Sequence, residues 1–185
     1  MRLISMVSLA LMPLITACVG SVQPVYTESD LVYDASLLGA WRDSGSTARA
    51  SVAAAKSSAY VIAFTDEDGR QGHFTAHLAR VGEMTLLDVE PEALAETLSE
   101  TYRDHFVPLH SFFFVKQGKD RVVLTLLELD KLNDFLQAQP GAVPHFVHDH
   151  DVVFTGEPRV IQAFLASYWQ RPGVLGDSMV WRRPQ

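Results

Sequence analysis

The sequence has almost no cysteine, because Cys18 is the only one in 185 residues. No disulfide can form within the chain, so a hydrophobic core must hold the fold together. Basic residues are also scarce, with 15 Lys and Arg against 22 Asp and Glu and a formal net charge of −7. Nucleic acid is therefore not an expected partner, since its binding requires a basic patch.

The sequence lacks the motifs of the common catalytic and cofactor-binding sites. It has no Gly-x-Ser-x-Gly turn, no phosphate-binding glycine loop and no dinucleotide fingerprint. These patterns position a nucleophile or a phosphate group in the enzymes that contain them. We therefore predict no catalytic residue and no cofactor, and we do not expect an enzyme.

The chain also lacks an apolar run long enough to cross a membrane, although a short one stands near its start. The segment 3–15 is mostly apolar, follows Arg2, and is interrupted by Ser5, Ser8 and Pro13. A membrane-spanning helix needs about 20 predominantly apolar residues. A positive start, a short apolar run and small residues at the end are instead typical of a secretory signal peptide. Residues 1–17 are predicted to be one.

The four residues Ile15-Thr16-Ala17-Cys18 close this segment. They resemble, position by position, the lipobox of bacterial lipoproteins. The resemblance implies cleavage before Cys18 and attachment of acyl chains to that residue, which would anchor the protein to a membrane. Val19 stands where enteric bacteria place Asp to retain a lipoprotein in the inner membrane. The resemblance therefore implies the periplasmic side of the outer membrane.

The sequence divides into three parts. Residues 1–17 form the predicted signal peptide, and residues 18–30 read as a lipidated N-terminus and flexible tether, because Gly, Ser, Gln and Pro occur there without periodicity. No composition change marks a boundary further along, so residues 31–185 are predicted to form one β-rich domain.

Short runs that alternate apolar and polar residues follow from Leu37 onward, separated by turn residues such as Asp68-Gly69. This period of two is typical of half-buried antiparallel strands. Helices are expected at 91–102 and 130–139, and an amphipathic helix is expected after the last strand, from Pro158 to Tyr168. The predicted strands are 38–42, 48–54, 60–64, 72–79, 84–89, 109–115, 121–127, 143–148 and 151–155.

These elements predict a mainly β (α+β) fold, an antiparallel meander that forms a curved sheet or a barrel of about eight strands with short helices and a C-terminal helix. Gly39-Ala40-Trp41 resembles the Gly-x-Trp motif of lipocalins, in which the tryptophan plugs the closed end of the barrel. That resemblance implies a lipocalin-like barrel. The helices predicted at 91–102 and 130–139 depart from the lipocalin pattern.

A barrel of this kind leads to the first functional hypothesis, the binding of a small apolar ligand in its interior. The alternative for the same side chains is that they fill the core solidly. A second hypothesis is an envelope protein that docks a protein or peptidoglycan partner. Six aromatic residues are the expected ligand contacts: Trp41, Tyr60, Phe64, Phe74, Phe112 and Phe114.

A third hypothesis is a metal-binding or hydrolytic protein built on histidines. His145, His148 and His150 lie close together in the sequence beside Asp149 and Asp151. Imidazole and carboxylate groups are ligands of zinc and copper. The same residues are also typical of a polar hairpin turn, and no fixed metal motif accompanies them.

Overall fold

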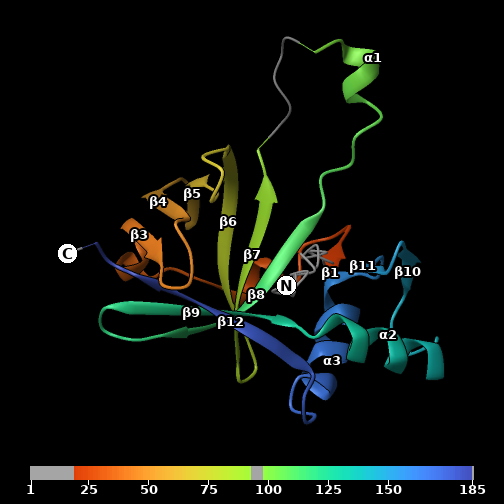
Figure 1. Ribbon diagram of the computed structural model, residues 1–185. Coiled ribbons are helices and arrows are strands. Elements are labelled where there is room, and N and C mark those ends of the chain that lie inside the picture. The colour runs from red at the N-terminus through yellow and green to blue at the C-terminus, as the bar shows by residue number, and fades with distance from the viewer. Residues whose placement is uncertain (1–18, 93–97, 185) are drawn as a thin grey trace, which may run out of the picture.

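The computed structural model describes residues 19–92 and 98–184 (Figure 1). The predicted signal peptide and Cys18 lie outside the described residues, as do residues 93–97 of the predicted helix 91–102.

Eight antiparallel strands form a closed barrel, which confirms the predicted fold class. Each strand pairs with the next along the chain, and the last pairs with both β9 and β3, so the wall has no open edge. Closure satisfies the backbone groups that an open sheet would leave unpaired at its edges. The barrel strands are β3 (Gly39–Asp43), β4 (Arg49–Ala54), β5 (Ala59–Thr65), β6 (Gln71–Val81), β7 (Met84–Pro91), β8 (His110–Gln117), β9 (Arg121–Leu127) and β12 (Leu175–Arg182).

The strand that closes the barrel, β12, was not predicted. Its sequence contains Gly176-Asp177-Ser178, which reads as a turn. In the structure the pairing with β9 shifts register between Leu175 and Ser178, so these residues form an irregularity inside a strand. The helix predicted near the C-terminus is present as α3 (Pro158–Tyr168), but β12 follows it.

Residues 19–30 form a packed part of the fold, so their prediction as a flexible tether was wrong. β1 (Val19–Ser21) pairs antiparallel with β8 and parallel with β11 (Asp151–Phe154). Val19 is 4% exposed and Val25 is fully buried. Two isolated apolar residues carry no periodicity, which is why the sequence pattern missed their burial.

Three short elements follow and fasten this segment to the barrel. They are η1 (Glu28–Asp30), β2 (Leu31–Val32), which pairs with β6, and η2 (Ala35–Leu37).

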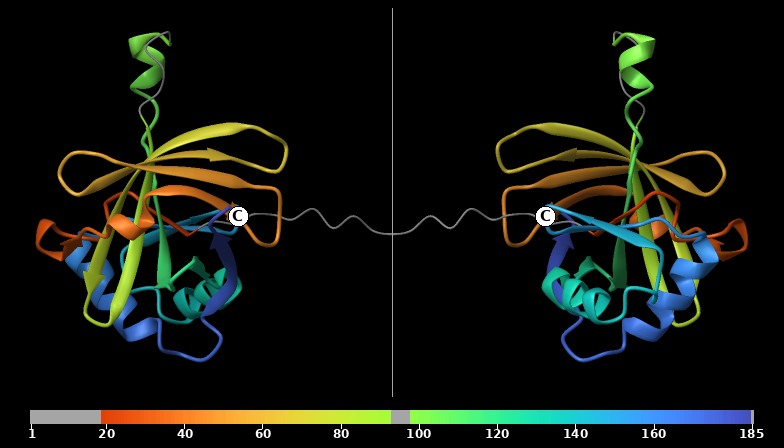
Figure 2. Two further views of the ribbon diagram at one scale, coloured as in Figure 1. Left: turned by 90° about the vertical axis from the view of Figure 1, so that its left-hand side faces the viewer. Right: turned by 90° about the vertical axis from the view of Figure 1, so that its right-hand side faces the viewer.

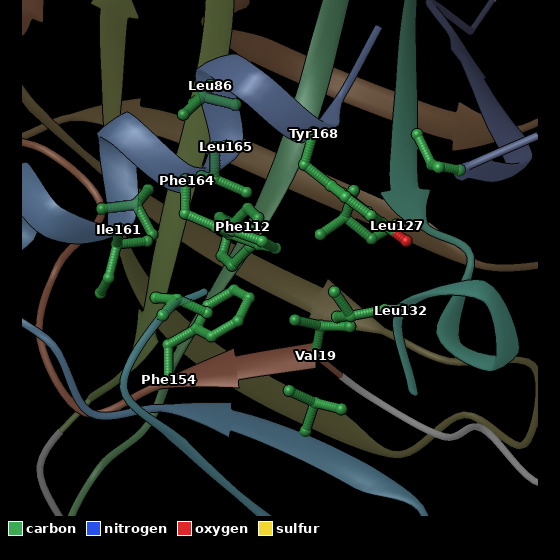
Figure 3. Close-up of a cluster of buried hydrophobic side chains, with 14 of the residues drawn as sticks. Val19, Leu86, Phe112, Leu127, Leu132, Phe154, Ile161, Phe164, Leu165 and Tyr168 are labelled. Carbon is green, nitrogen blue, oxygen red and sulfur yellow. The ribbon is translucent and has the colours of Figure 1, made fainter. Parts of the chain in front are cut away.

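Two helices and a hairpin cover the outside of the barrel, along the face of β7 and β8 (Figures 1 and 2). The helix predicted at 130–139 is present as α2 (Leu129–Ala138), and β10 (His145–His148) pairs with β11. Apolar side chains from these elements and from the barrel wall form an outer core (Figure 3). No helix among the described residues combines the length and the apolar character required to cross a membrane.

The described part of the connection between β7 and β8, residues 98–109, projects away from the barrel (Figures 1 and 2). A helix was predicted over 91–102, but β7 extends to Pro91 and the described part of the connection has only the single turn α1 (Glu100–Arg103). Residues 98–109, here called the arm, carry exposed apolar side chains. These are Leu98, Tyr102, Phe106, Val107 and Leu109.

Candidate ligand cavity

The barrel interior contains a cavity of about 350 Å³. Its volume lies at the lower end of the range for small-molecule pockets. The wall is almost entirely apolar, and among the described residues no charged side chain contributes to it. The lining residues are Leu37, Trp41, Ala50, Val52, Tyr60, Ile62, Phe64, Phe74, Leu87, Val89, Pro91, Leu109, Ser111, Phe113, Val122, Leu124, Met179 and Trp181.

Trp41 forms part of the cavity wall, and Arg183 packs on its ring. The indole N–H of Trp41 donates to the Leu37 carbonyl at 2.8 Å, and the Arg183 guanidinium lies 4.6 Å from the centre of the Trp41 ring. Arg183 also donates to the carbonyls of Ser36 and Leu38. Two contacts therefore fix the orientation of the ring: the hydrogen bond to a backbone carbonyl and the packing of a cation against one ring face.

Gly39 makes this arrangement possible. Its φ of +112° suits glycine and few other residues, and a Cβ atom at this position would stand 2.9 Å from Nη1 of Arg183. A larger residue at position 39 would be strained and would push against the guanidinium.

Tyr60 is fully buried and its hydroxyl is already bonded. It accepts from the Asp34 N–H at 2.7 Å and donates to the Asp34 carbonyl at 3.2 Å, while the Tyr33 ring stacks on it with centres 5.3 Å apart. Burial raises the pKa of Tyr60 above its usual value of 10.0. The ring therefore presents its apolar face to the cavity and its polar end to the backbone.

Four of the six predicted ligand contacts line the cavity: Trp41, Tyr60, Phe64 and Phe74. Phe112 and Phe114 do not, because they point outward into the outer core (Figure 3 shows Phe112). Their neighbour Phe113 faces the cavity instead. Both faces of β8 are covered by apolar groups, so the sequence does not alternate there and its inward face could not be read from the pattern.

Sequence reasoning also missed lining residues on other strands. On β7 the inward residues are Leu87 and Val89, whereas Leu86 belongs to the outer core. On β12 they are Met179 and Trp181, from a strand that was not predicted. Met179, Val180 and Trp181 form a short apolar run, which was the available signal for a strand.

The cavity reaches the surface at the base of the arm. Pro91 and Leu109 are the exposed residues of the lining, and they stand where the chain leaves β7 and enters β8. Val107 and Phe106 continue the apolar surface outward, with exposures of 67% and 49%. The arm therefore continues the apolar lining outward from this opening.

The three histidines of the proposed metal site are not brought together. His145 and His148 occupy the two ends of β10, about 10 Å apart at 3.3 Å per residue. The His145 Nδ1 lies 2.8 Å from the Val143 carbonyl, and His150 has the positive φ of a turn residue. Within residues 19–92 and 98–184, no group of three His, Cys, Asp or Glu side chains could hold a metal ion.

A buried polar cluster lies outside the barrel, beneath the N-terminal segment. Asp88 is 1% exposed; its Oδ2 accepts from the Val25 N–H at 2.9 Å, and its Oδ1 lies 2.6 Å from Nδ1 of His110. The other ring nitrogen of His110 is 3.7 Å from Glu90. Burial lowers the pKa of His110, but the hydrogen bond to Asp88 and the charges of Asp88 and Glu90 outweigh it and raise this pKa above 6.5.

Tyr26 and His77 extend this cluster. The Tyr26 hydroxyl lies 3.0 Å from Nδ1 of His77. Burial, followed by the charges of Asp88 and Glu90, raises the pKa of Tyr26 to about 12. The cluster bonds the N-terminal segment to β7, and none of its members lines the cavity. Its geometry supports a structural role.

No protein-family model, curated protein or solved structure matches this chain.

Proposed function

We propose that this protein holds a small apolar molecule inside its barrel, at a membrane surface to which Cys18 anchors it. The observation that carries the first part is the cavity of about 350 Å³ with its apolar wall. A void of this size lined by apolar groups reduces stability when it stays empty, because the lining atoms lose contacts. An apolar ligand would restore those contacts and remove its own surface from water.

The partial burial of the lining also supports a ligand rather than a solid core. Ile62, Phe64, Val89 and Phe113 are half-buried although they point into the barrel. In a filled core such residues would be almost completely covered. The space in front of them is available to a guest molecule.

Tryptophan fluorescence provides a direct test of ligand binding. Trp41 and Trp181 line the cavity, whereas the third tryptophan, Trp169, stacks on Phe114 in the outer core. In a Trp169→Phe background, titration with 1-decanol should change the emission of the two cavity tryptophans with saturation. A linear, unsaturable response would contradict the proposal.

A pair of matched variants locates the binding site. Val89→Phe adds volume inside the cavity and should weaken binding of 1-decanol about tenfold. Val160→Phe makes the same change on α3, where Val160 is 43% exposed, and should leave binding unchanged. Equal affinities in the two variants would place the ligand outside the barrel.

The lipobox at residues 15–18 supports the anchor at Cys18, and Val19, in place of a retaining Asp, supports the periplasmic side of the outer membrane. Two or more acyl chains hold a protein on a bilayer for practical purposes. Mass spectrometry of the N-terminal peptide should find a cleaved, acylated Cys18, and Cys18→Ser should release the protein from the membrane fraction. An unmodified Cys18 in a full-length chain would contradict the anchor.

The exposed apolar side chains of the arm favour a second candidate function, the docking of an envelope partner. Tyr102 and Phe106 contact each other with ring centres 4.9 Å apart, and both are about half exposed. Site-specific crosslinking from Phe106 in intact cells should yield one defined adduct if this function is correct. Crosslinking from the exposed Val160 on α3 is the control position, and identical adducts from both would argue against a dedicated surface.

A further inference from the structure

We infer that the cavity selects an uncharged ligand with one hydrogen-bonding group, and that Ser111 binds this group. The inference rests on the proposed binding function and specifies the chemical class of its ligand. Three properties of the lining carry it.

The first property is the absence of any charged side chain among the lining residues. An ionised carboxylate or ammonium group that leaves water without a partner loses its hydration, which strongly opposes its burial. The Arg183 guanidinium is near, but it packs on Trp41 and donates to the carbonyls of Ser36 and Leu38. A ligand with a charge inside the cavity would therefore find no compensating group.

The second property is that the polar atoms of two lining rings are already bonded to the backbone. The Trp41 indole N–H is bonded to Leu37, and the Tyr60 hydroxyl is bonded to Asp34. The indole N–H of Trp181 has no partner among the described residues, but the atom is completely covered by its surroundings. A guest molecule would have to displace side chains to reach it.

The third property concerns Ser111, the single hydroxyl-bearing aliphatic residue of the lining. It faces inward from β8, as does Phe113, and Leu109 just before the strand also lines the cavity; Ser111 is half-buried. Among the described residues its hydroxyl has no hydrogen-bond partner. Unlike the indole N–H of Trp181, this hydroxyl is not completely covered by its surroundings. A ligand hydroxyl, ester or ketone could therefore bond to it without any rearrangement.

The position of Ser111 also orients the ligand. It lies two residues, or about 7 Å, from Leu109, where the cavity reaches the surface. Trp41 and Leu37, by contrast, are buried at the closed part of the wall. The polar group of the ligand should therefore lie toward the opening, and its apolar body should lie against the two tryptophans.

Two probes of equal chain length test the selection against charge. At pH 8, 1-decanol is neutral and decanoate is ionised, and both carry ten carbon atoms. In the Trp169→Phe background, we expect 1-decanol to bind at least tenfold more tightly than decanoate. Equal affinities would overturn the inference while leaving the proposed function intact. Failure of both probes to bind would contradict the proposed function itself.

Variants of Ser111 test its role directly. Ser111→Ala should weaken 1-decanol binding threefold to tenfold, since one hydrogen bond is lost. Ser111→Thr keeps the hydroxyl and should retain part of that affinity. Ser51→Ala, on the exposed face of β4, is the matched control and should have no effect. If Ser111→Ala binds 1-decanol as the parent does, Ser111 is not the contact.

Discussion

The two faces of the wall formed by β7 and β8 differ in how completely they are packed. On the outer face, Leu86 and Phe112 are 0% and 1% exposed and contact α3 (Figure 3). On the inner face, Leu87, Val89 and Phe113 are half-buried and border the cavity. One pair of strands therefore supports a dense core on one side and an open space on the other.

This difference separates stability from binding. Densely packed residues lose both transfer free energy and contacts when they are truncated, whereas residues beside an existing void lose fewer contacts. The outer core should hold the fold together, and the inner face should determine what the cavity accepts. Substitutions on adjacent residues can test this separation.

The largest expected effect comes from Phe112 and Phe113, neighbours of the same type on opposite faces. Phe112→Ala should reduce the free energy of unfolding by about 3–5 kcal/mol, the range for a fully buried aromatic residue. Phe113→Ala should cost less than half as much and should change the affinity for 1-decanol. Urea denaturation and the fluorescence titration measure the two effects, and equal losses of stability would break the comparison.

The next effect concerns the outer polar cluster. Asp88→Ala removes the acceptor of the Val25 N–H and the partner of His110, so it leaves two buried polar groups without their hydrogen bonds. The free energy of unfolding should fall by about 3 kcal/mol at pH 6. Hydrogen exchange should accelerate first in residues 19–27, which Asp88 fastens to the barrel. Exchange that accelerates uniformly across the barrel would show that the segment is not held separately.

A smaller effect is expected from pH. The folded-state pKa of His110 is raised above its unfolded value of 6.5. Its contribution to stability is therefore complete below about pH 6.5 and is lost as the pH rises through the folded-state pKa. Unfolding measured from pH 6 to pH 9 should show this decline. His110→Gln should flatten it, and a decline that persists in His110→Gln would assign it to another group.

The smallest effect is expected at Tyr168, whose hydroxyl is a buried polar group among the labelled outer-core residues of Figure 3. Its hydroxyl points toward Leu127 and has no partner among the described residues. Tyr168→Phe removes this unsatisfied group and should raise the free energy of unfolding by about 1 kcal/mol. Thermal unfolding with Phe164→Tyr as a reciprocal control would sharpen the picture of a dry outer core, and a destabilised Tyr168→Phe would contradict it.

The sequence predicted the elements well where one face of a strand meets solvent. The strand 72–79 alternates between Phe74, Ala76 and Leu78 on one side and polar residues on the other, and its central part was read correctly. The helices at 129–138 and 158–168 were predicted because apolar residues recur there at helical spacing.

The errors occurred where burial does not follow a simple period. Phe112, Phe113 and Phe114 form an unbroken apolar run because both faces of β8 are covered. Of the six residues predicted as ligand contacts, four line the cavity, whereas Phe112 and Phe114 face outward. Val19 and Val25 are buried by tertiary packing. The surrounding segment, which is rich in Gly, Ser and Pro, shows no pattern that predicts this burial. The volume of the cavity depends on barrel closure, and no local pattern specifies it.

Closure of the barrel also sets an order of events. Trp181 on β12 pairs with Asp43 on β3. β3, the first barrel strand in the sequence, can therefore complete its backbone pairing only after β12, the last one, is in place. Contacts between such distant positions form slowly, because a long loop must close before they are gained. Residues up to Trp181 must therefore have emerged from the ribosome, and from any export channel, before the barrel interior can close. A guest molecule present at that moment would find the wall open on its full length.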